Sequence, residues 1–475
     1  MTPYQIKFGT SGWRGIISDD FTFDNVRIVA QAIAEFIKSK KDEKGKPVII
    51  GGDARFLSDK FSEAAAEVMA GNGISVLLCD RDTPTPVIAY EIIRRKAAGG
   101  INFTASHNPP EYNGLKFSPS WGGPATPAET NAIENNIRKV KVVKRVDFNE
   151  AKKKELIKIF DPSPYYLERI KELVDFSEIK KSNLKIIADP LYSTGRGYLD
   201  KLLYDAKVNV KVINNKKDVL FGGYPPEPAE KNIKDLIDTV KKEKAMLGVA
   251  TDGDADRYGI IDEDGSYIPA NKILTLLLDY LVKTRKSWKG AAIRSVATSH
   301  MIDRVAAMHG IKLYETPVGF KYIGEIMTKE DIIIGGEESN GLTIHRHIPE
   351  KDGIIACLLV VEMVARNKKN IKQLLKELEE KTGPFFNTRK NYKISENQKR
   401  KLMEKLKYFE KGKIGKYEIK EINKIDGYKF ILGEDLWIMV RLSGTEPIVR
   451  LYGEAKSKKD LEYIMQQGEK FILEN

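Results

Sequence analysis

The sequence predicts an α/β protein of several domains that ends in a smaller α+β domain. Short apolar segments, typical of buried strands, alternate with segments of helical periodicity over most of the chain, which is the pattern of α/β sheets. This alternation stops near Pro384, after which strands and helices follow one another in a different order. The length of 475 residues, at about 150 residues a domain, indicates three or four domains.

The first domain is expected over residues 1–150. Its predicted elements are the strands 47–52, 74–79 and 99–106 and the helix 58–70. The lysine-dense stretch 138–158 follows, and we place a domain boundary there because such runs of charge are usually solvated.

The second and third domains are expected over residues 151–258 and 259–378. The second has predicted strands at 183–189, 208–214 and 245–252, and it closes near an apolar pair of strands around the turn Asp264–Gly265. The third has predicted helices at 272–283 and 300–309 and predicted strands at 291–296 and 331–336. The last domain, 379–475, has predicted helices at 396–408 and 458–473 and predicted strands at 417–422, 436–442 and 447–455.

The composition is that of a soluble globular protein, with 41% hydrophobic and 31% charged residues. The 79 Lys and Arg residues exceed the 67 Asp and Glu residues and give a net charge of +12, which raises the question of a nucleic-acid partner. Because acids are interleaved with these bases and no separate basic tail exists, we expect no nucleic-acid partner.

The two cysteines, Cys79 and Cys357, lie in apolar runs, so we expect them to be buried and exclude a disulfide framework and a cysteine zinc site. No apolar segment approaches the ~18 residues that a membrane span needs. We therefore expect a cytoplasmic protein without a membrane partner.

The segment Asp252–Arg257 offers three carboxylates, Asp252, Asp254 and Asp256, directly after an apolar strand. Carboxylates this close repel one another unless a cation lies between them, so the segment favours a divalent cation such as Mg²⁺ beside a phosphate. A solvated acidic turn is the simpler alternative. An EF-hand is excluded, because Arg257 occupies the sixth position, where that loop needs glycine.

The segment 104–110 presents Ser106 on a loop that Pro109 and Pro110 stiffen. Its hydroxyl is a candidate nucleophile or phosphate acceptor, although an ordinary turn serine remains an alternative. A hydrolase triad is disfavoured, because in extended backbone the side chains of Ser106 and His107 point to opposite faces.

Two further loops indicate ligand binding. Residues 441–447, followed by Arg450, combine hydroxyls, glycine and guanidinium groups, which suits a phosphate ester, although a plain hairpin is the alternative. The motif lacks the signature of a nucleotide-binding P-loop. Residues 336–341 place Glu337 and Ser339 at a strand end, where they suit sugar hydroxyls. We expect the nearby His345 and His347 to make structural or substrate contacts and not to bind metal.

Four motifs, TASHNP, DGDADR, GEESNG and RLSGTEP, occur in this order, one in each predicted domain. The set resembles the signature loops of the α-D-phosphohexomutase family, of the phosphoglucomutase/phosphomannomutase type. The resemblance implies four domains around a central cleft, three of them related mixed α/β domains and the last an α+β domain. The domains would supply, in order, the phosphoserine, the metal site, the sugar-binding loop and the phosphate-binding loop.

The resemblance also implies residue roles. Ser106 would hold the transferable phosphoryl group, and Asp252, Asp254 and Asp256 would bind Mg²⁺ together with a phosphoserine oxygen. Glu337 and Ser339 would bind sugar hydroxyls. The phosphate that does not react would contact Arg441, Ser443, Gly444 and Thr445. The residues near the reacting oxygen or the phosphate would be Arg14, His107, Lys116, Arg257 and Lys351, with Lys116 and His107 as the candidate general bases.

Gly341 stands where mannose-accepting and glucosamine-accepting relatives commonly have histidine, so the sequence is more similar to the phosphoglucomutase branch. The expected reaction interconverts glucose 1-phosphate and glucose 6-phosphate, with glucose 1,6-bisphosphate as intermediate and activator. A phosphomannomutase or a dual-specific enzyme remains an alternative. From other classes, a metal-dependent sugar-phosphate phosphatase and a non-catalytic sugar-phosphate sensor also remain open. We expect a monomer or a small homo-oligomer.

Overall fold

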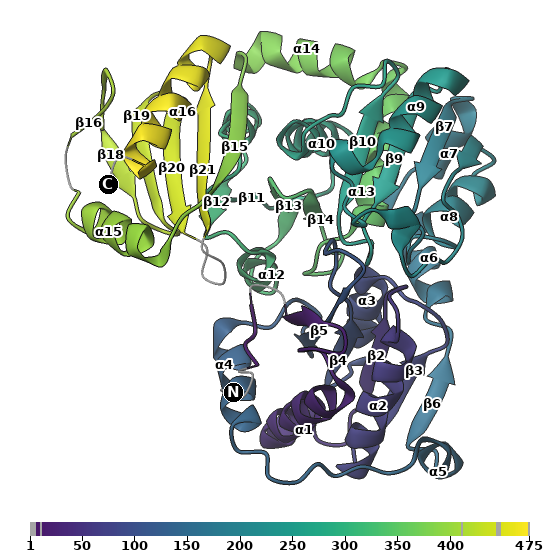
Figure 1. The fold of residues 1–475 in the computed structure, drawn as a ribbon. Coiled ribbons are helices and arrows are strands. Elements are labelled where there is room, and N and C mark those ends of the chain that lie inside the picture. Colours follow the sequence, from purple (N-terminus) through teal and green to yellow (C-terminus); the bar gives the residue numbers. More distant parts are fainter. Residues whose placement is uncertain (1–5, 10–11, 410–411, 443–447, 474–475) are drawn as a thin grey trace.

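A computed structural model describes residues 6–9, 12–409, 412–442 and 448–473. The chain forms four units that follow one another along an arc, from the purple first unit to the yellow last one (Figure 1). Each unit has its own main sheet, of six, four, four and five strands in chain order. A separate two-stranded sheet, β16 (Lys413–Ile414) with β17 (Tyr417–Glu418), belongs to the last unit.

The first sheet is mixed. Its strand order is β1 (Trp13–Ile16), β5 (Tyr112–Pro119), β4 (Gly99–Phe103), β2 (Val48–Gly52), β3 (Val76–Cys79), β6 (Ile157–Phe160). The strands from β4 to β6 run parallel, while β5 runs antiparallel to both of its neighbours. The helices of this unit are α1 (Phe23–Ser39), α2 (Ser58–Gly71), α3 (Thr85–Arg95), α4 (Pro127–Ile137) and α5 (Phe148–Lys153), with a short 3₁₀ turn η1 (Lys41–Glu43).

The second sheet has the order β10 (Tyr258–Asp262), β9 (Leu247–Thr251), β7 (Lys185–Asp189), β8 (Asn209–Val212). It is parallel except for β10, which pairs antiparallel with β9. Its helices are α6 (Ser163–Leu173), α7 (Phe176–Lys181), α8 (Leu199–Asp205) and α9 (Lys234–Glu243), and two 3₁₀ turns, η2 (Phe221–Gly223) and η3 (Glu230–Asn232), lie between β8 and α9.

The third sheet repeats this arrangement, with the order β12 (Leu313–Thr316), β11 (Ala291–Ser295), β13 (Ile332–Glu337), β14 (Gly341–Ile344). Only β14 is antiparallel to its neighbour. The helices are α10 (Ala270–Thr284), α11 (Met301–Met308), α12 (Phe320–Met327), α13 (Gly353–Asn367) and α14 (Ile371–Thr382).

Helix α13 joins the second and third units. Thirteen of its fifteen residues, among them Cys357, are buried, and the helix packs against β9, β10 and β14. One hydrophobic core includes α13 together with Ile186 and Leu247 of the second unit and Leu274 and Ile334 of the third. The two units therefore share a continuous core. Both cysteines are free and buried, as the sequence predicts.

The last unit is an antiparallel sheet with the order β15 (Phe386–Lys393), β21 (Ile448–Ala455), β20 (Leu436–Leu442), β19 (Tyr428–Gly433), β18 (Glu421–Asn423). Helices α15 (Glu396–Lys407) and α16 (Lys458–Leu473) supply the apolar cover of one face. The opposite face packs onto the third unit, where Trp437, Met439 and Tyr452 contact Val296 and Ala297. The predicted change from α/β to α+β architecture is confirmed.

One strand lies in another sheet than the expected ranges imply. Strand β6 lies within residues 151–258, the range expected for the second domain, but it pairs with β3 and completes the first sheet. Strand β10 belongs to the apolar strand pair expected to close the second domain, and it pairs with β9 of the second sheet. At β6 the lysine-dense stretch gives no signal of strand pairing, and it is the pairing that decides which sheet the strand joins. Among the described residues, no helix is both long and apolar enough to cross a membrane.

Candidate active site

Three polar loops meet where strands of different sheets end. The loop after β4 carries Ser106, the loop after β9 carries Asp252–Arg257, and Lys351 comes from the segment after β14. Ligands of α/β sheets bind beyond the carboxyl ends of strands, and the structure brings these loops together at such ends. The loops belong to the first, second and third units, so the site is built across three units.

Ser106 lies in contact with the carboxylate cluster. Its hydroxyl donates a hydrogen bond of 2.8 Å to Asp252 Oδ2, and the residue is only 1% exposed. Its backbone has a φ of 51°, in the left-handed region that non-glycine residues rarely adopt. An unusual backbone conformation that its surroundings hold in place is typical of functional sites.

The relation between Ser106 and His107 differs from the one expected. Because Ser106 is not extended, the two side chains do not point to opposite faces, and His107 Nδ1 lies 3.4 Å from Ser106 Oγ. The prediction that the two side chains point to opposite faces is therefore wrong. The positive charge of Arg257, burial and the charge of Arg14 hold the pKa of His107 well below its usual value, so the imidazole is neutral.

Asp252, Asp254 and Asp256 form a cluster that fits a metal ion. One carboxylate oxygen from each lies within 4.8 Å of the others, and all three residues are fully buried. The second oxygens Asp254 Oδ1 and Asp256 Oδ1 are buried without any hydrogen-bond partner. Burial and the neighbouring carboxylates raise the pKa of Asp252 well above its usual value. Unpaired buried carboxylate oxygens suit a hard divalent cation such as Mg²⁺.

Two lysines partly neutralise the cluster. Lys116 Nζ lies 2.5 Å from Asp254 and 2.9 Å from Asp256, and Lys351 Nζ lies 2.7 Å from Asp256. Burial lowers the pKa of Lys116, but the charges of Asp254 and Asp256 outweigh it and raise that pKa above the usual lysine value. Lys116 is thus an ammonium group held by two carboxylates, which does not favour it as a general base.

Arg14 and Arg257 add positive charge beside the serine loop. Arg14 Nη1 donates to Asn108 Oδ1 at 2.5 Å, and burial together with the charge of Arg257 lowers the pKa of Arg14 to about 10. Arg257 Nε is buried without a hydrogen-bond partner, 3.9 Å from Asp256 Oδ1. Two half-buried guanidinium groups that repel one another suit the binding of an anion such as phosphate.

The loop after β13 holds the predicted sugar ligands. Glu337 Oε1 accepts a hydrogen bond of 2.6 Å from the Gly319 amide, and Ser339 Oγ donates to Glu337 Oε2 at 3.4 Å. Burial and the charge of Glu338 raise the pKa of Glu337 to about 7. Ser339 also lines a cavity of about 300 Å³ that Arg257 borders from the second unit and β15 and β21 border from the last.

The last unit presents two arginines next to each other. Arg441 and Arg450 are directly opposite in the pairing of β20 with β21, so their side chains lie on the same face. Arg441 Nε donates to Asp426 Oδ2 at 2.8 Å, and the same oxygen accepts from the Val318 amide of the third unit at 3.0 Å. The predicted phosphate ligands Ser443, Gly444 and Thr445 lie outside the described residues.

The predicted histidines after β14 have structural partners. His345 Nδ1 lies 2.7 Å from the Ile332 carbonyl, and His347 Nε2 lies 2.7 Å from Asp352 Oδ2. Neither joins the carboxylate cluster, which among the described residues is the one group with metal-site geometry.

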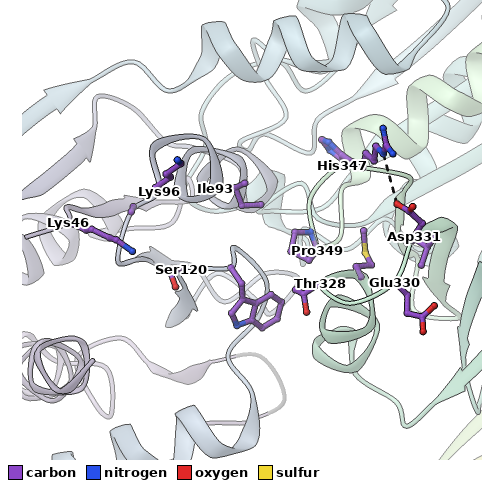
Figure 2. Close-up of a pocket in the computed structure, with 14 residues that line it drawn as sticks. Lys46, Ile93, Lys96, Ser120, Thr328, Glu330, Asp331, His347 and Pro349 are labelled. Atoms are coloured by element: carbon purple, nitrogen blue, oxygen red, sulfur yellow. Dashed lines mark ion pairs between the residues drawn. The ribbon is translucent and has the colours of Figure 1, made fainter. Parts of the chain in front are cut away.

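A larger cavity, of about 470 Å³, lies between the first and third units. Figure 2 shows Lys46, Lys96 and Ser120 on one side and Thr328, Asp331 and Pro349 on the other. It contains charges of both signs and, apart from His347, none of the residues singled out from the sequence, so we assign the active site to the loops around Ser106.

Sequence reasoning missed several polar residues of the site. Asp53 and Arg55 follow the apolar strand β2 directly and bond to the Ser106 loop. The same signal that identified the other loops, a buried strand that runs into polar residues, is present at 48–55 and could have found them. Glu350 and Arg389 carried no such signal. Glu350 is buried beside Lys351 with a pKa that burial raises to about 7, and Arg389 borders the 300 Å³ cavity.

Comparison with known proteins gives a consistent result over the whole chain. Models of the phosphoglucomutase/phosphomannomutase alpha/beta/alpha domains I, II and III match residues 5–144, 164–265 and 269–382. The model of the C-terminal domain of the same family matches residues 390–469.

Individual relatives agree with the family models. A phosphoglucomutase/phosphomannomutase of Thermococcus kodakarensis is 31% identical over 98% of this chain and 98% of its own length. A probable phosphoglucosamine mutase of Methanosphaera stadtmanae is 32% identical, again over 98% of each chain. The crystal structure of a putative phosphomannomutase from Thermus thermophilus, 31% identical, superposes with a TM-score of 0.85 over 99% of both chains.

Proposed function

The chain belongs to the phosphoglucomutase/phosphomannomutase family and is a phosphohexomutase, and we propose that it interconverts glucose 1-phosphate and glucose 6-phosphate through a phosphoserine at Ser106. The observation that carries this proposal is the hydrogen bond of 2.8 Å between Ser106 Oγ and Asp252. It places a hydroxyl next to three buried carboxylates that suit a divalent cation. A phosphoryl group on this oxygen would lie between that cluster and the guanidinium groups of Arg14 and Arg257.

The residues present fit Mg²⁺. Asp252, Asp254 and Asp256 would hold the ion, together with an oxygen of the phosphoserine, and the two unpaired carboxylate oxygens are available for this. When bound, Mg²⁺ supplies charge neutralisation at the phosphoryl oxygens, which makes phosphorus a better electrophile.

In the first half-reaction, glucose 1-phosphate binds with its O6 hydroxyl towards phosphoserine 106. The bond between phosphorus and Ser106 Oγ breaks, and a bond between phosphorus and O6 forms. The proton of O6 leaves through a general base and returns to Ser106 Oγ, so the products are free Ser106 and glucose 1,6-bisphosphate. Arg14, Arg257 and Lys351 surround the transferred group with positive charge, which stabilises the transition state.

In the second half-reaction, the bisphosphate lies in the opposite orientation and presents its 1-phosphate to Ser106. The bond between phosphorus and O1 breaks, the bond to Ser106 Oγ forms, and the serine proton moves to O1. Glucose 6-phosphate leaves and the phosphoserine is restored. Added glucose 1,6-bisphosphate activates the enzyme because it phosphorylates any Ser106 that has lost its phosphoryl group.

We assign the general base to His107. Its Nδ1 lies 3.4 Å from Ser106 Oγ, within reach of a proton that moves to or from that oxygen. Lys116, the other candidate, already donates to both Asp254 and Asp256. We assign to Lys116 the compensation of the carboxylate charge.

The sugar would bind at Glu337 and Ser339, and the phosphate that does not react would bind at Arg441, Arg450 and the segment that contains Ser443, Gly444 and Thr445. Glucose is proposed as the preferred sugar because of Gly341. A methyl group at this position would lie 2.3 Å from the Lys351 side chain, so a larger residue such as histidine would require Lys351 to move. Mannose phosphates are the second candidate pair, because named relatives include phosphomannomutases.

One experiment tests this proposal. The purified protein is assayed with glucose 1-phosphate, Mg²⁺ and trace glucose 1,6-bisphosphate, and the mass of the peptide that contains Ser106 is measured in parallel. We expect glucose 6-phosphate and a peptide heavier by one phosphoryl group. Release of inorganic phosphate would identify a phosphatase, and absence of both turnover and peptide phosphorylation would identify a sensor. The same assay with mannose and glucosamine phosphates ranks the sugars.

A further inference from the structure

Arg55 is a buried charged residue that the reaction described above does not use. It follows strand β2 and is only 1% exposed. No substrate can reach a side chain that has no exposed surface. A guanidinium group in such a place must have its donors satisfied by the protein, because an unpaired buried charge is unfavourable.

All five N–H groups of Arg55 have acceptors, and four of the acceptors are backbone carbonyls, three in the Ser106 loop and one at the start of β5. Nη2 donates to the carbonyl oxygens of Ser106 at 2.7 Å and Asn108 at 2.6 Å. Nη1 donates to those of Pro109 at 2.7 Å and Tyr112 at 3.0 Å. One side chain thus replaces the hydrogen bonds that a helix or strand would give this irregular segment.

The remaining donor of Arg55 begins a second chain of hydrogen bonds, which also reaches Ser106. Arg55 Nε donates to Asp53 Oδ2 at 3.1 Å, and Thr104 Oγ1 donates to that oxygen at 2.6 Å. The Thr104 hydroxyl in turn accepts a hydrogen bond of 2.8 Å from the Ser106 amide. Both the amide and the carbonyl of Ser106 are therefore held by the Asp53–Arg55 pair, directly or through Thr104.

This double attachment accounts for the backbone of Ser106. A φ of 51° is unfavourable for a residue with a Cβ atom and persists only where the surroundings hold it. The same φ brings His107 Nδ1 to within 3.4 Å of Ser106 Oγ. If the loop relaxed to extended backbone, the two side chains would separate.

The second unit packs against both the Arg55 side chain and the Ser106 loop. The Arg55 guanidinium lies over the ring of Phe221, 5.1 Å from its centre. Gly253, between two of the metal-binding aspartates, approaches the Ser106 carbonyl so closely that a methyl group there would lie 2.6 Å from the oxygen. The carbonyl that Arg55 holds is therefore also a point of close approach of the metal loop.

We propose that Arg55 is the positioning residue of the phosphoserine loop. Through four backbone carbonyls and through Asp53 and Thr104 it fixes Ser106 Oγ relative to Asp252 and His107. The inference rests on the proposed function, because it assigns the role of Arg55 in phosphoryl transfer at Ser106. Arg55 contacts neither sugar nor phosphate, so its removal should slow the transfer step and leave substrate affinity almost unchanged.

The test compares Arg55→Lys with Arg27→Lys. Arg27 is a matched control because its guanidinium pairs with Asp24 on α1, outside the site. Lysine keeps the charge but has three donors in place of five, so it cannot hold four carbonyls and a carboxylate. We expect kcat with glucose 1-phosphate to fall about 100-fold while KM stays within about twofold, because small misplacements of reacting groups have effects of this size. The control should keep the wild-type kcat.

A second readout follows the serine itself. Phosphorus NMR of the phosphorylated enzyme reports the surroundings of the phosphoserine, and we expect its resonance to shift or broaden in Arg55→Lys and to stay in place in Arg27→Lys. Should Arg55→Lys fail to fold, Thr104→Val tests the same attachment. It replaces the Thr104 hydroxyl with a methyl group of similar size and so removes the hydrogen bond from the Ser106 amide. We expect about a tenfold lower kcat for Thr104→Val, again with little change in KM.

An unchanged kcat in a folded Arg55→Lys, or in Thr104→Val when Arg55→Lys does not fold, overturns the positioning role. A rise in KM that accounts for the whole loss of kcat/KM also overturns it, since that would indicate a role in substrate binding. Failure of the proposed function is separate, because it appears in the wild-type enzyme as absence of turnover and of Ser106 phosphorylation. In that case the phosphorus signal is absent from every variant, and Arg55 would have no transfer step to position.

Discussion

Ser106 Oγ and Asp252 Oδ2 lie 2.8 Å apart and join the first unit to the second by a hydrogen bond. The two residues are separated by 146 positions in the chain, and each stands at the end of a buried strand of its own sheet. The hydroxyl and the carboxylate cluster thus form one site only when the two units are in contact.

Ser106→Ala should abolish phosphohexomutase activity. The oxygen that carries the phosphoryl group is lost, and removal of such a nucleophile commonly costs at least about 1000-fold in kcat. Ser39→Ala is the control, because the Ser39 hydroxyl donates to the Phe36 carbonyl within helix α1, outside the site. The coupled assay measures both variants, and substantial turnover by Ser106→Ala would contradict the phosphoserine mechanism.

Removal of the divalent cation should abolish turnover reversibly. EDTA treatment is expected to stop the reaction, and added Mg²⁺ should restore it. Asp254→Asn should raise the Mg²⁺ concentration needed for half-maximal rate by at least about tenfold, because it removes one negative ligand. Asp59→Asn, on the exposed start of α2, is the matched control. Full activity in EDTA would show that the carboxylate cluster needs no metal.

His107→Gln should lower kcat about 100-fold to 1000-fold with little effect on KM, because a general base contributes to this extent. Lys116→Met should act differently. It leaves Asp254 and Asp256 without their ammonium partner, which is unfavourable for two buried carboxylates, and is expected to weaken both stability and turnover. Steady-state kinetics and thermal unfolding of the two variants separate the roles. A wild-type kcat for His107→Gln would rule out our assignment.

Gly253→Ala should separate the metal loop from the serine loop. A methyl group at Gly253 would lie 2.6 Å from the Ser106 carbonyl oxygen, and backbone atoms cannot easily give way. We expect kcat to fall about 100-fold, as for other small displacements of reacting groups. The control is Gly433→Ala, where the new methyl group makes an ordinary contact of 3.6 Å with Leu436. Equal activity of the two variants would contradict the close approach.

Asp189, at the end of β7, should make stability depend on pH. Burial raises the pKa of its carboxyl to about 7, above the usual value, so the folded state binds a proton that the unfolded state has released. Stability should therefore fall as pH rises from about 4 to 7, by at most about 1.4 kcal/mol per pH unit. We expect the difference in urea midpoint between wild type and Asp189→Asn to change over this range. A constant difference would show that the carboxyl is ionised in the folded protein.

The sequence predicts much of this architecture because buried strands have a strong local signal. The apolar runs of β2, β9 and β13 are visible without any knowledge of their neighbours, and each leads into a polar loop. Pairing between distant strands has no such signal. Strand β6 is a short segment within a lysine-rich stretch, and only its contact with β3 places it in the first sheet.

The same difference between local signals and long-range contacts applies to the candidate active site. Ser106 and Asp252 could be proposed from their motifs, because their chemistry is readable from residue type and spacing. The nearness of His107 to Ser106 Oγ could not, because it depends on the φ of one residue, and that φ depends on Arg55, which is 51 positions away. Long-range hydrogen bonds of this kind determine which chemically competent groups can reach each other.

The core that the second and third units share fixes the spacing between the carboxylate cluster and Glu337, the proposed sugar ligand. Glucose 1-phosphate and glucose 6-phosphate must then fit the same fixed spacing, although they would bind in opposite orientations. If Glu337 binds the sugar as proposed, a hexose is a substrate only when its hydroxyls contact Glu337 in both orientations. Substrate selectivity would therefore depend on how similar the arrangement of the sugar hydroxyls is in the two orientations, as well as on the individual hydroxyl groups.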